Sequence, residues 1–184
     1  MSGIANYTDD DIKTLSPREH IRLRPGMYIG KLGDGMAPDD GIYVLIKEVM
    51  DNSVDEFIMG AGKVIEITVE GKAVTIRDYG RGIPLKSLAA AVSEMNTGGK
   101  YGSAAFEKTV GLNGVGVKAV NMLSSEFMAR SVRDGEAHTV HFAAGIQQDD
   151  IWESGVNERT GTLIRFVVDE EVFGEYSYNL EYVE

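Results

Sequence analysis

A helical period between Asp40 and Gly60 constrains the fold of this chain more than any other feature. Asp40 is a candidate N-cap, and Gly60 and Gly62 end the pattern. Apolar or small residues recur along one stripe at helical spacing, at Ile42, Leu45, Ile46, Val49, Ser53 and Phe57. A helix with one apolar stripe buries that stripe against another layer, so the rest of the sequence must supply one.

Strand patterns supply this second layer. Alternating runs at 64–70 and 73–77, joined at Gly71-Lys72, predict a hairpin, and further strands are expected at 126–132, 137–143 and 162–168. Shorter helices are predicted at 85–95 and 117–123, and Ser16 with Glu19 predicts a helix start. The order of elements indicates an α+β fold, a two-layer sandwich of helices on one mostly antiparallel β-sheet.

Composition limits the classes of function. The 184 residues fit one domain, with residues 1–15 expected as an N-terminal arm and 16–184 as the domain. Eighteen basic against 29 acidic side chains give a net charge of −11, which disfavours broad binding of nucleic acid. Without cysteine there is no disulfide, thiolate metal site or cysteine nucleophile. No signal peptide or run of ~18 apolar residues is present, so we expect a cytoplasmic protein.

The predicted long helix carries a first group of candidate site residues. Glu48, Asn52 and Glu56 stand at i, i+4 and i+8 and therefore share one helical face. The three residues form an ordinary solvated face, or else Glu48 and Asn52, one turn apart, act together as functional residues. In the second case the Asn52 oxygen binds Mg²⁺, while the Glu48 carboxylate orients a water molecule.

A second candidate group follows the predicted hairpin. Asp78 comes directly after a strand and is followed by Gly80 and Gly82. This pattern is either a tight turn or a place where the carboxylate accepts a hydrogen bond from an exocyclic amine, with glycines that let a flat ring approach the backbone. Arg81 is a candidate partner for Glu56, or half of a surface ion pair that contributes little stability.

The third candidate group is a glycine-rich stretch, residues 96–116, of the kind that often forms a functional lid. Gly114 and Gly116 precede a predicted helix, where free N–H groups can bind phosphate. Lys100 could add charge to such a site, or simply be solvated. The stretch is no Rossmann motif, because no strand precedes it, and no P-loop, because neither Lys100 nor Lys118 precedes Ser or Thr.

Together these motifs resemble a known nucleotide-binding fold. Glu48 with Asn52, Asp78 with Gly80 and Gly82, and the later glycines match in order and spacing the Bergerat fold of the GHKL superfamily, which includes gyrase, Hsp90, histidine kinases and MutL. Residues 24–30, 48–56, 78–84 and 161–162 narrow the resemblance to the ATPase subunits (the gyrase B or ParE type) of bacterial type IIA DNA topoisomerases. It covers about residues 7–166.

This resemblance implies a role for each candidate. Glu48 would be the general base, Asn52 the Mg²⁺ ligand, and Asp78, with Thr162, would bind the adenine amino group of ATP. Tyr7 on the arm would reach the nucleotide of a second copy of the chain. The other implied nucleotide-binding residues are Arg81, Gly82, Ile83 and Pro84 around the adenine, Arg133 at the pocket mouth where inhibitors bind, and Lys100, Asn113, Gly114, Val115, Gly116 and Val117 around the triphosphate.

The sequence also departs from the family pattern. Tyr43 and Val44 stand where many members have a His pair before the base, Val110 replaces a glycine of the lid, and Asn113 replaces its usual histidine. A transducer domain, the DNA-cleaving TOPRIM parts and the contacts with the A-type subunit and DNA would lie beyond residue 184. We therefore expect this chain to bind ATP and ATP-competitive inhibitors with little or no turnover.

Two alternatives remain open on the sequence alone. One is another ATPase of the same superfamily, of the MutL or Hsp90 kind, which the motif at residues 24–30 and the run from Arg81 to Pro84 disfavour. The other is a non-catalytic acidic interaction module whose glycines only form turns, and which would have no affinity for nucleotides.

Overall fold

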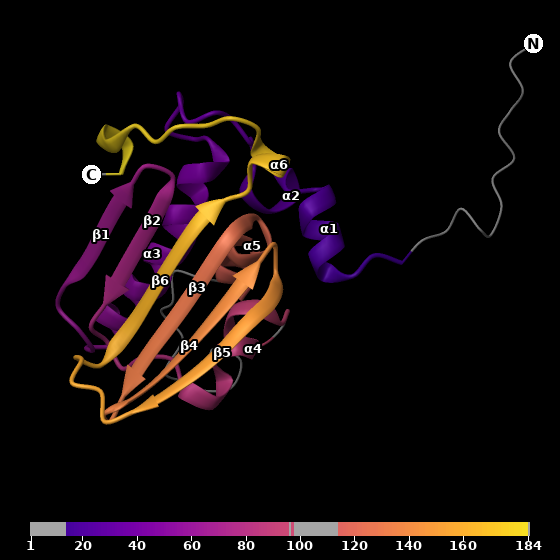
Figure 1. The fold of residues 1–184 in the computed structure, drawn as a ribbon. Coiled ribbons are helices and arrows are strands. Elements are labelled where there is room, and N and C mark those ends of the chain that lie inside the picture. Colours follow the sequence, from indigo (N-terminus) through magenta and orange to yellow (C-terminus); the bar gives the residue numbers. More distant parts are fainter. Residues whose placement is uncertain (1–13, 96, 98–113, 184) are drawn as a thin grey trace, which may run out of the picture.

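The computed structural model describes residues 14–95, 97 and 114–183. Figure 1 shows one antiparallel sheet with α3, α4 and α5 on one of its faces. The strands lie in the order β1-β2-β6-β3-β4-β5. They are β1 (Ile65–Glu70), β2 (Ala73–Asp78), β3 (Ser124–Arg133), β4 (Glu136–Ala143), β5 (Ile146–Ser154) and β6 (Gly161–Val168). The predicted α+β sandwich of helices on an antiparallel sheet is confirmed.

The helices are α1 (Pro17–Leu23), α2 (Gly26–Ile29), α3 (Gly41–Ile58), α4 (Leu88–Ser93), α5 (Gly116–Met122) and α6 (Glu170–Phe173), with 3₁₀ turns at Leu85–Ser87 and Leu180–Tyr182. The predicted helices appear in the expected order, and two further short helices, α2 and α6, were not predicted. None of the helices in the described ranges is both long enough and apolar enough to cross a lipid bilayer.

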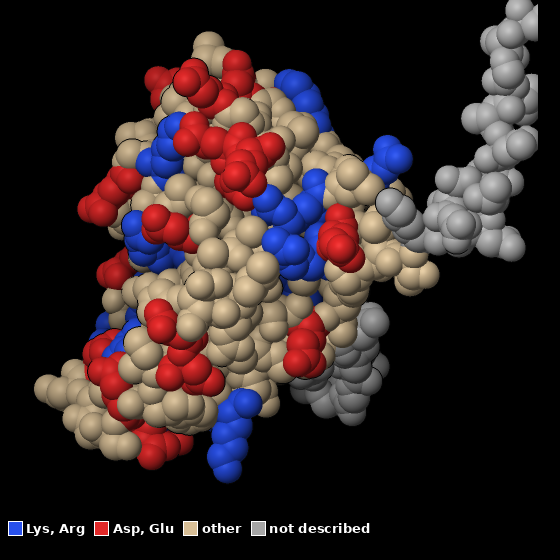
Figure 2. Space-filling view, turned by 45° about the vertical axis from the view of Figure 1, so that its right-hand side comes forward, with Lys and Arg blue, Asp and Glu red and all other residues tan. Residues whose placement is uncertain are grey.

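The core lies between α3 and the inner face of the sheet. Leu45 and Val49 of α3 are buried together with Ile76 of β2 and Phe166 of β6. Strand residues alternate between this apolar face and the opposite one, because successive side chains of a strand point to opposite sides. On the face that Figure 2 presents, acidic and basic side chains are interspersed around apolar and neutral ones.

Helix α1 begins with the predicted capping box. The Ser16 hydroxyl accepts a hydrogen bond from the Glu19 N–H at 3.2 Å, and the Glu19 carboxylate accepts one from the Ser16 N–H at 2.8 Å. The helix ends at Leu23, before the Arg24-Pro25 pair that cannot continue it, and α2 begins at Gly26.

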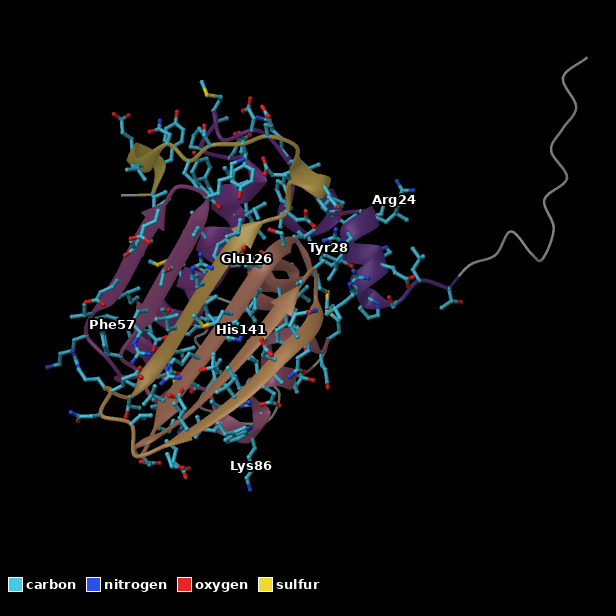
Figure 3. The ribbon with its side chains drawn as sticks, viewed as in Figure 1. Arg24, Tyr28, Phe57, Lys86, Glu126 and His141 are labelled. Atoms are coloured by element: carbon cyan, nitrogen blue, oxygen red, sulfur yellow. The ribbon has the colours of Figure 1, made fainter. Side chains whose placement is uncertain are left out.

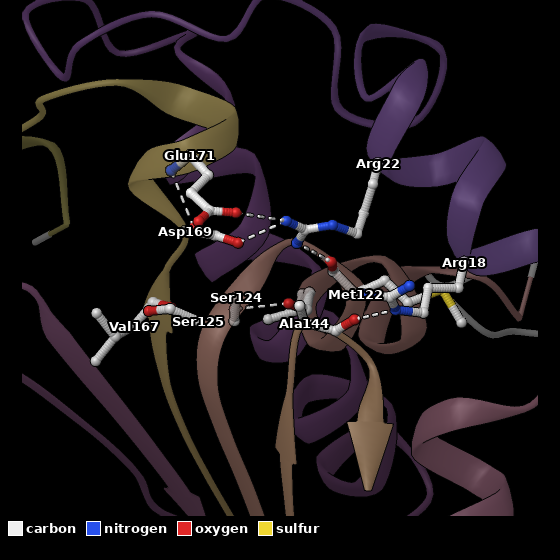
Figure 4. Close-up of polar contacts among 10 residues, drawn as sticks. Arg18, Arg22, Met122, Ser124, Ser125, Ala144, Val167, Asp169 and Glu171 are labelled. Carbon is white, nitrogen blue, oxygen red and sulfur yellow. Dashed lines mark hydrogen bonds and ion pairs between the residues drawn. The ribbon is translucent and has the colours of Figure 1, made fainter.

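Arg22 attaches α1 to the rest of the fold (Figure 4). Its Nη2 lies 2.7 Å from Oδ2 of Asp169, just after β6, and its Nη1 donates to the Met122 carbonyl at the end of α5. Arg18 adds a bond to the Ala144 carbonyl in the turn between β4 and β5. Two arginines of one short helix thus join three segments that are distant in sequence.

Two local predictions are wrong, and a third is confirmed only in position. Asp40 is the N-cap residue of α3, which begins at Gly41, but its side chain makes no capping hydrogen bond. It accepts bonds from the Gly35 and Ala37 N–H groups and from Lys31, and the Lys31 bond lowers the pKa of Asp40. Phe57, expected on the apolar stripe, is 57% exposed at the end of α3 (Figure 3). The expected helix at 85–95 is a 3₁₀ turn followed by the shorter α4.

Strand β5 was not expected at all. Its run Gln147-Gln148-Asp149-Asp150 is polar, and all nine residues of the strand are exposed. Among the described strands, β5 pairs with β4 alone, at the edge of the sheet. Without a buried face, it has none of the alternation by which a strand is recognised.

The Arg22 contacts predict a measurable loss of stability in Arg22→Met. We expect the free energy of unfolding to fall by about 2 kcal/mol, since charge-assisted hydrogen bonds are lost while the aliphatic volume is kept. Urea unfolding measures the change. Arg24→Met, an exposed position in the same segment (Figure 3), is the control and should stay near wild type. Equal stability of the two variants would contradict this account.

Candidate functional site

Asp78 ends β2 with its carboxylate held by three elements. It is 7% exposed, and its Oδ1 accepts hydrogen bonds from the Gly80 N–H at 2.9 Å and the Thr162 N–H at 3.2 Å. The Ser53 hydroxyl of α3 lies 3.4 Å from Oδ2. β2 pairs with β6, whose first residues include Thr162, so the sheet itself brings this N–H to the carboxylate.

The environment of Asp78 favours its acid form relative to an exposed aspartate. Burial raises the pKa of Asp78, and the nearby Glu56 charge adds to this against the opposing N–H groups of Gly80 and Thr162. The bond from Ser53 to Oδ2, at 3.4 Å, is longer than the two bonds to Oδ1, and a carboxylate oxygen has two lone pairs. Oδ2 can therefore accept a hydrogen bond from a ligand.

Glycines let the loop after Asp78 lie against its neighbours. Gly161 has φ +146°, and a Cβ there would lie 2.2 Å from the Asp78 carbonyl. Gly82 has φ +72°, and its Cβ would lie within 3.0 Å of Val132 and Arg133 at the end of β3. In addition, the Ser131 hydroxyl donates to the Ile83 carbonyl at 2.6 Å. These contacts bring three of the predicted site residues, Gly82, Ile83 and Arg133, close together.

The pairing of Arg81 with Glu56 that the sequence suggested is present. Oε2 of Glu56 accepts from both the backbone N–H and the Nε of Arg81 at 3.0 Å, and Oε1 accepts from Nη2 at 2.8 Å. Burial alone would raise the pKa of Glu56, but the bonds from Arg81 outweigh it and lower the pKa. The side chains of Arg81 and Glu56 are 50% and 25% exposed, so the pair orients the loop more than it stabilises the fold.

The Glu48 side chain extends from α3 to the start of α5. A Cβ on Gly116 would come within 1.9 Å of Oε2 of Glu48, so the carboxylate rests directly on this glycine. The first N–H groups of a helix have no partner within the helix, and they carry a partial positive charge. Asn52 is exposed one turn further along α3. The geometry therefore combines a carboxylate, an amide and backbone N–H groups.

Helix α3 connects the two halves of this candidate site. Ser53 contacts Asp78 while Glu48 contacts Gly116. Five residues of α-helix rise by about 7.5 Å. A ligand with a hydrogen-bonding ring at one end and anionic groups at the other could contact both halves.

The structure describes some of the other predicted site residues and not the rest. Pro84 is exposed just before the 3₁₀ turn. Gly114, Val115 and Val117 lie with Gly116 at the start of α5, each of them half-buried. The expected residues Tyr7, Lys100 and Asn113 lie outside the described residues.

Sequence reasoning missed Ser53 and Ser131 as site residues. Ser53 was assigned to the apolar stripe of α3, where it is indeed buried, but its hydroxyl faces Asp78. The sequence signal for Ser53 is a single hydroxyl among the apolar residues of the predicted stripe. No comparable signal marks Ser131 within its strand.

Tyr43, one of the two residues at which the sequence departs from the expected His pair, contacts a different part of the chain from Glu48. Its hydroxyl donates to the Gly35 carbonyl at 2.7 Å and accepts from the Asn179 N–H at 2.8 Å. Its ring packs edge-on against Tyr178 and Tyr182. Tyr43 therefore joins α3 to the loop before it and to the last described segment.

A hollow of about 400 Å³ opens on the opposite face of the sheet. There Arg77 and Arg159 stack on the ring of Tyr79, with guanidinium carbons 5.1 and 4.1 Å from its centroid. Arg77 also donates to the Arg159 carbonyl, and the Tyr79 hydroxyl donates to Glu66. The hollow is thus separate from the Asp78 carboxylate, which faces α3.

Comparisons with known proteins agree with this geometry. The B subunit of DNA topoisomerase 4 from Borreliella burgdorferi is 53% identical over 180 residues, which are 97% of this chain and 30% of that protein. The B subunit of DNA gyrase from Treponema denticola is 35% identical over 187 residues, 96% of this chain and 28% of that protein. The chain therefore spans about 30% of the length of these curated relatives.

A solved structure is also similar. It is the crystal structure of the 43K ATPase domain of Thermus thermophilus gyrase B in complex with an aminocoumarin, with a TM-score of 0.75 and 26% sequence identity. The match covers 90% of this chain and 43% of that one. The family model of histidine kinase-, DNA gyrase B- and HSP90-like ATPases matches residues 37–171, which include Glu48 and Asp78. The chain belongs to this ATPase family.

Proposed function

We propose that this chain is the ATP-binding part of the B subunit of a type IIA DNA topoisomerase, in which ATP binding and hydrolysis drive DNA strand passage. The observation that carries the proposal is the Asp78 carboxylate, fixed by Gly80, Thr162 and Ser53, on the same helix-lined face as Glu48 beside Gly116. Residues 16–184 form the nucleotide-binding domain and residues 1–15 the arm.

Of the two types of B subunit, topoisomerase IV and gyrase, the topoisomerase IV type is the better supported. Within Borreliella burgdorferi, the topoisomerase 4 protein is 53% identical to this chain and the gyrase protein is 33% identical. The chain is thus more similar to one paralogue than to the other in the same organism. We propose that the parent protein acts on DNA in the cytoplasm with an A-type subunit.

At the adenine end, Asp78 accepts the hydrogen bond of the exocyclic amine, next to Thr162. Gly82, Ile83 and Pro84 line the flat face of the ring, and the absence of a Cβ at Gly82 lets this loop lie against the end of β3. Arg81, oriented by Glu56, lies beside the ring. Arg133 stands at the mouth, where ATP-competitive inhibitors would contact it.

At the triphosphate end, Glu48 acts as the general base for the attacking water. The N–H groups of residues 114–117 bind phosphate oxygens, and Lys100 and Asn113 add to them. Asn52 fits a Mg²⁺ site because its exposed amide lies one turn from Glu48, and Mg²⁺ accepts a single protein oxygen together with phosphates and water. The ion would neutralise phosphate charge in the complex.

The other proposals concern the whole protein. Tyr7 on the arm reaches the nucleotide of a second copy when ATP closes the dimer. Groups from a following transducer domain complete the hydrolytic site, so the chain by itself binds ATP with little or no turnover.

Asp78→Asn tests the proposed function. We expect the affinity for a non-hydrolysable ATP analogue with Mg²⁺ to fall at least about tenfold, about 1.4 kcal/mol, because the acceptor of the adenine amine loses its charge. Calorimetry measures it. Asp134→Asn, the same change in the exposed turn between β3 and β4, is the matched control and should bind as wild type. A folded Asp78→Asn with unchanged affinity would refute the adenine site.

Gly116→Ala tests the triphosphate end. The new Cβ displaces the Glu48 carboxylate, which can rotate away, so we expect an unchanged melting temperature but about tenfold weaker binding of the same analogue. Gly26→Ala is the control, since a Cβ there meets nothing within 4 Å. Wild-type affinity in Gly116→Ala would show that this contact has no part in binding.

A further inference from the structure

Lys118 is a buried cation to which the proposed function assigns no role. Its residue is 2% exposed, and lysine is almost never fully buried unless its ammonium is partnered. Here Nζ donates to two backbone carbonyls, those of Thr97 and Gly114, each at 2.6 Å. The ammonium therefore lies inside the fold beneath the first turn of α5.

The two carbonyls come from separate parts of the chain. Thr97 follows α4, and Gly114 immediately precedes the start of α5. One turn further along α5, the Asn121 amide donates to the Val92 carbonyl of α4 at 2.9 Å. Two side chains of α5 thus fix its position relative to α4, and Lys118 fixes the end nearest Glu48.

The bond to Gly114 also sets the direction of the next N–H group. A peptide unit is planar and trans, so the carbonyl of Gly114 and the N–H of Val115 point in opposite directions. Because the carbonyl points to the buried Lys118 ammonium, the Val115 N–H points away from it. Gly116, the next residue, rests against the Glu48 carboxylate.

We propose that Lys118 is a positioning residue for the triphosphate. By holding the Gly114 carbonyl, it presents the N–H groups at the start of α5 to the phosphates beside Glu48. This inference rests on the proposed function. It adds that the phosphate-contacting N–H groups depend on Lys118, a residue of α5 that does not itself contact the phosphates.

A purely structural role makes a different prediction. An apolar side chain of similar length fills the same volume without the cost of burying an ammonium. If Lys118 served only packing, Lys118→Met would leave nucleotide binding unchanged, or would weaken the binding of every ligand equally by loosening the fold. A positioning role weakens only ligands that carry phosphates.

The experiment compares two ligands on Lys118→Met, by calorimetry with Mg²⁺: a non-hydrolysable ATP analogue and adenosine. We expect the affinity for the analogue to fall at least about tenfold, while that for adenosine stays within about twofold. Lys72→Met, which removes one cation from the turn between β1 and β2, is the control and should bind both ligands as wild type.

Equal affinities of Lys118→Met and wild type, or equal losses for the two ligands, would overturn the inference. Should Lys118→Met fail to fold, Lys118→Leu replaces it with the same two outcomes, since its apolar side chain also cannot donate to the carbonyls. A wild-type chain that binds neither ligand would contradict the proposed function itself, which separates the two failures.

Discussion

The rest of this site depends on the hydrogen bonds that hold the buried carboxylate of Asp78. An ionisable group in the interior costs free energy unless it is hydrogen-bonded, and here N–H groups of Gly80 and Thr162 provide those bonds. They come from the loop after β2 and from the start of β6. The antiparallel pairing of these strands is therefore a condition for the site and not only a feature of the fold.

Helix α3 connects Asp78 to the other end of the site. Ser53 contacts Asp78, Glu56 holds Arg81, and Glu48 reaches the start of α5. Glycine stands at two of the contacts, Gly80 against Glu56 and Gly116 against Glu48, where a Cβ would lie 2.9 and 1.9 Å from a carboxylate oxygen. A Cβ at either position would therefore displace the carboxylate that lies against it.

Sequence patterns predicted the larger elements and failed where burial was not periodic. The capping box of α1 and the β1–β2 hairpin followed from local chemistry. Strand β5 was missed because it is polar and exposed throughout, and Phe57 was misplaced because α3 projects beyond the core at its end. Lys118 looked like an ordinary lysine, since the carbonyls that it binds lie in separate parts of the fold.

The amino-acid sequence by itself determined the order of those elements that have a periodic buried face, the acidic charge and the motifs around Glu48, Asp78 and Gly114, because these depend on neighbouring residues and their spacing. Only the tertiary structure decided that Ser53 and Thr162 meet at Asp78, and that Gly116 supports Glu48. Such contacts join residues far apart in the chain. Their distances are set by strand pairing and helix packing, which no local pattern encodes.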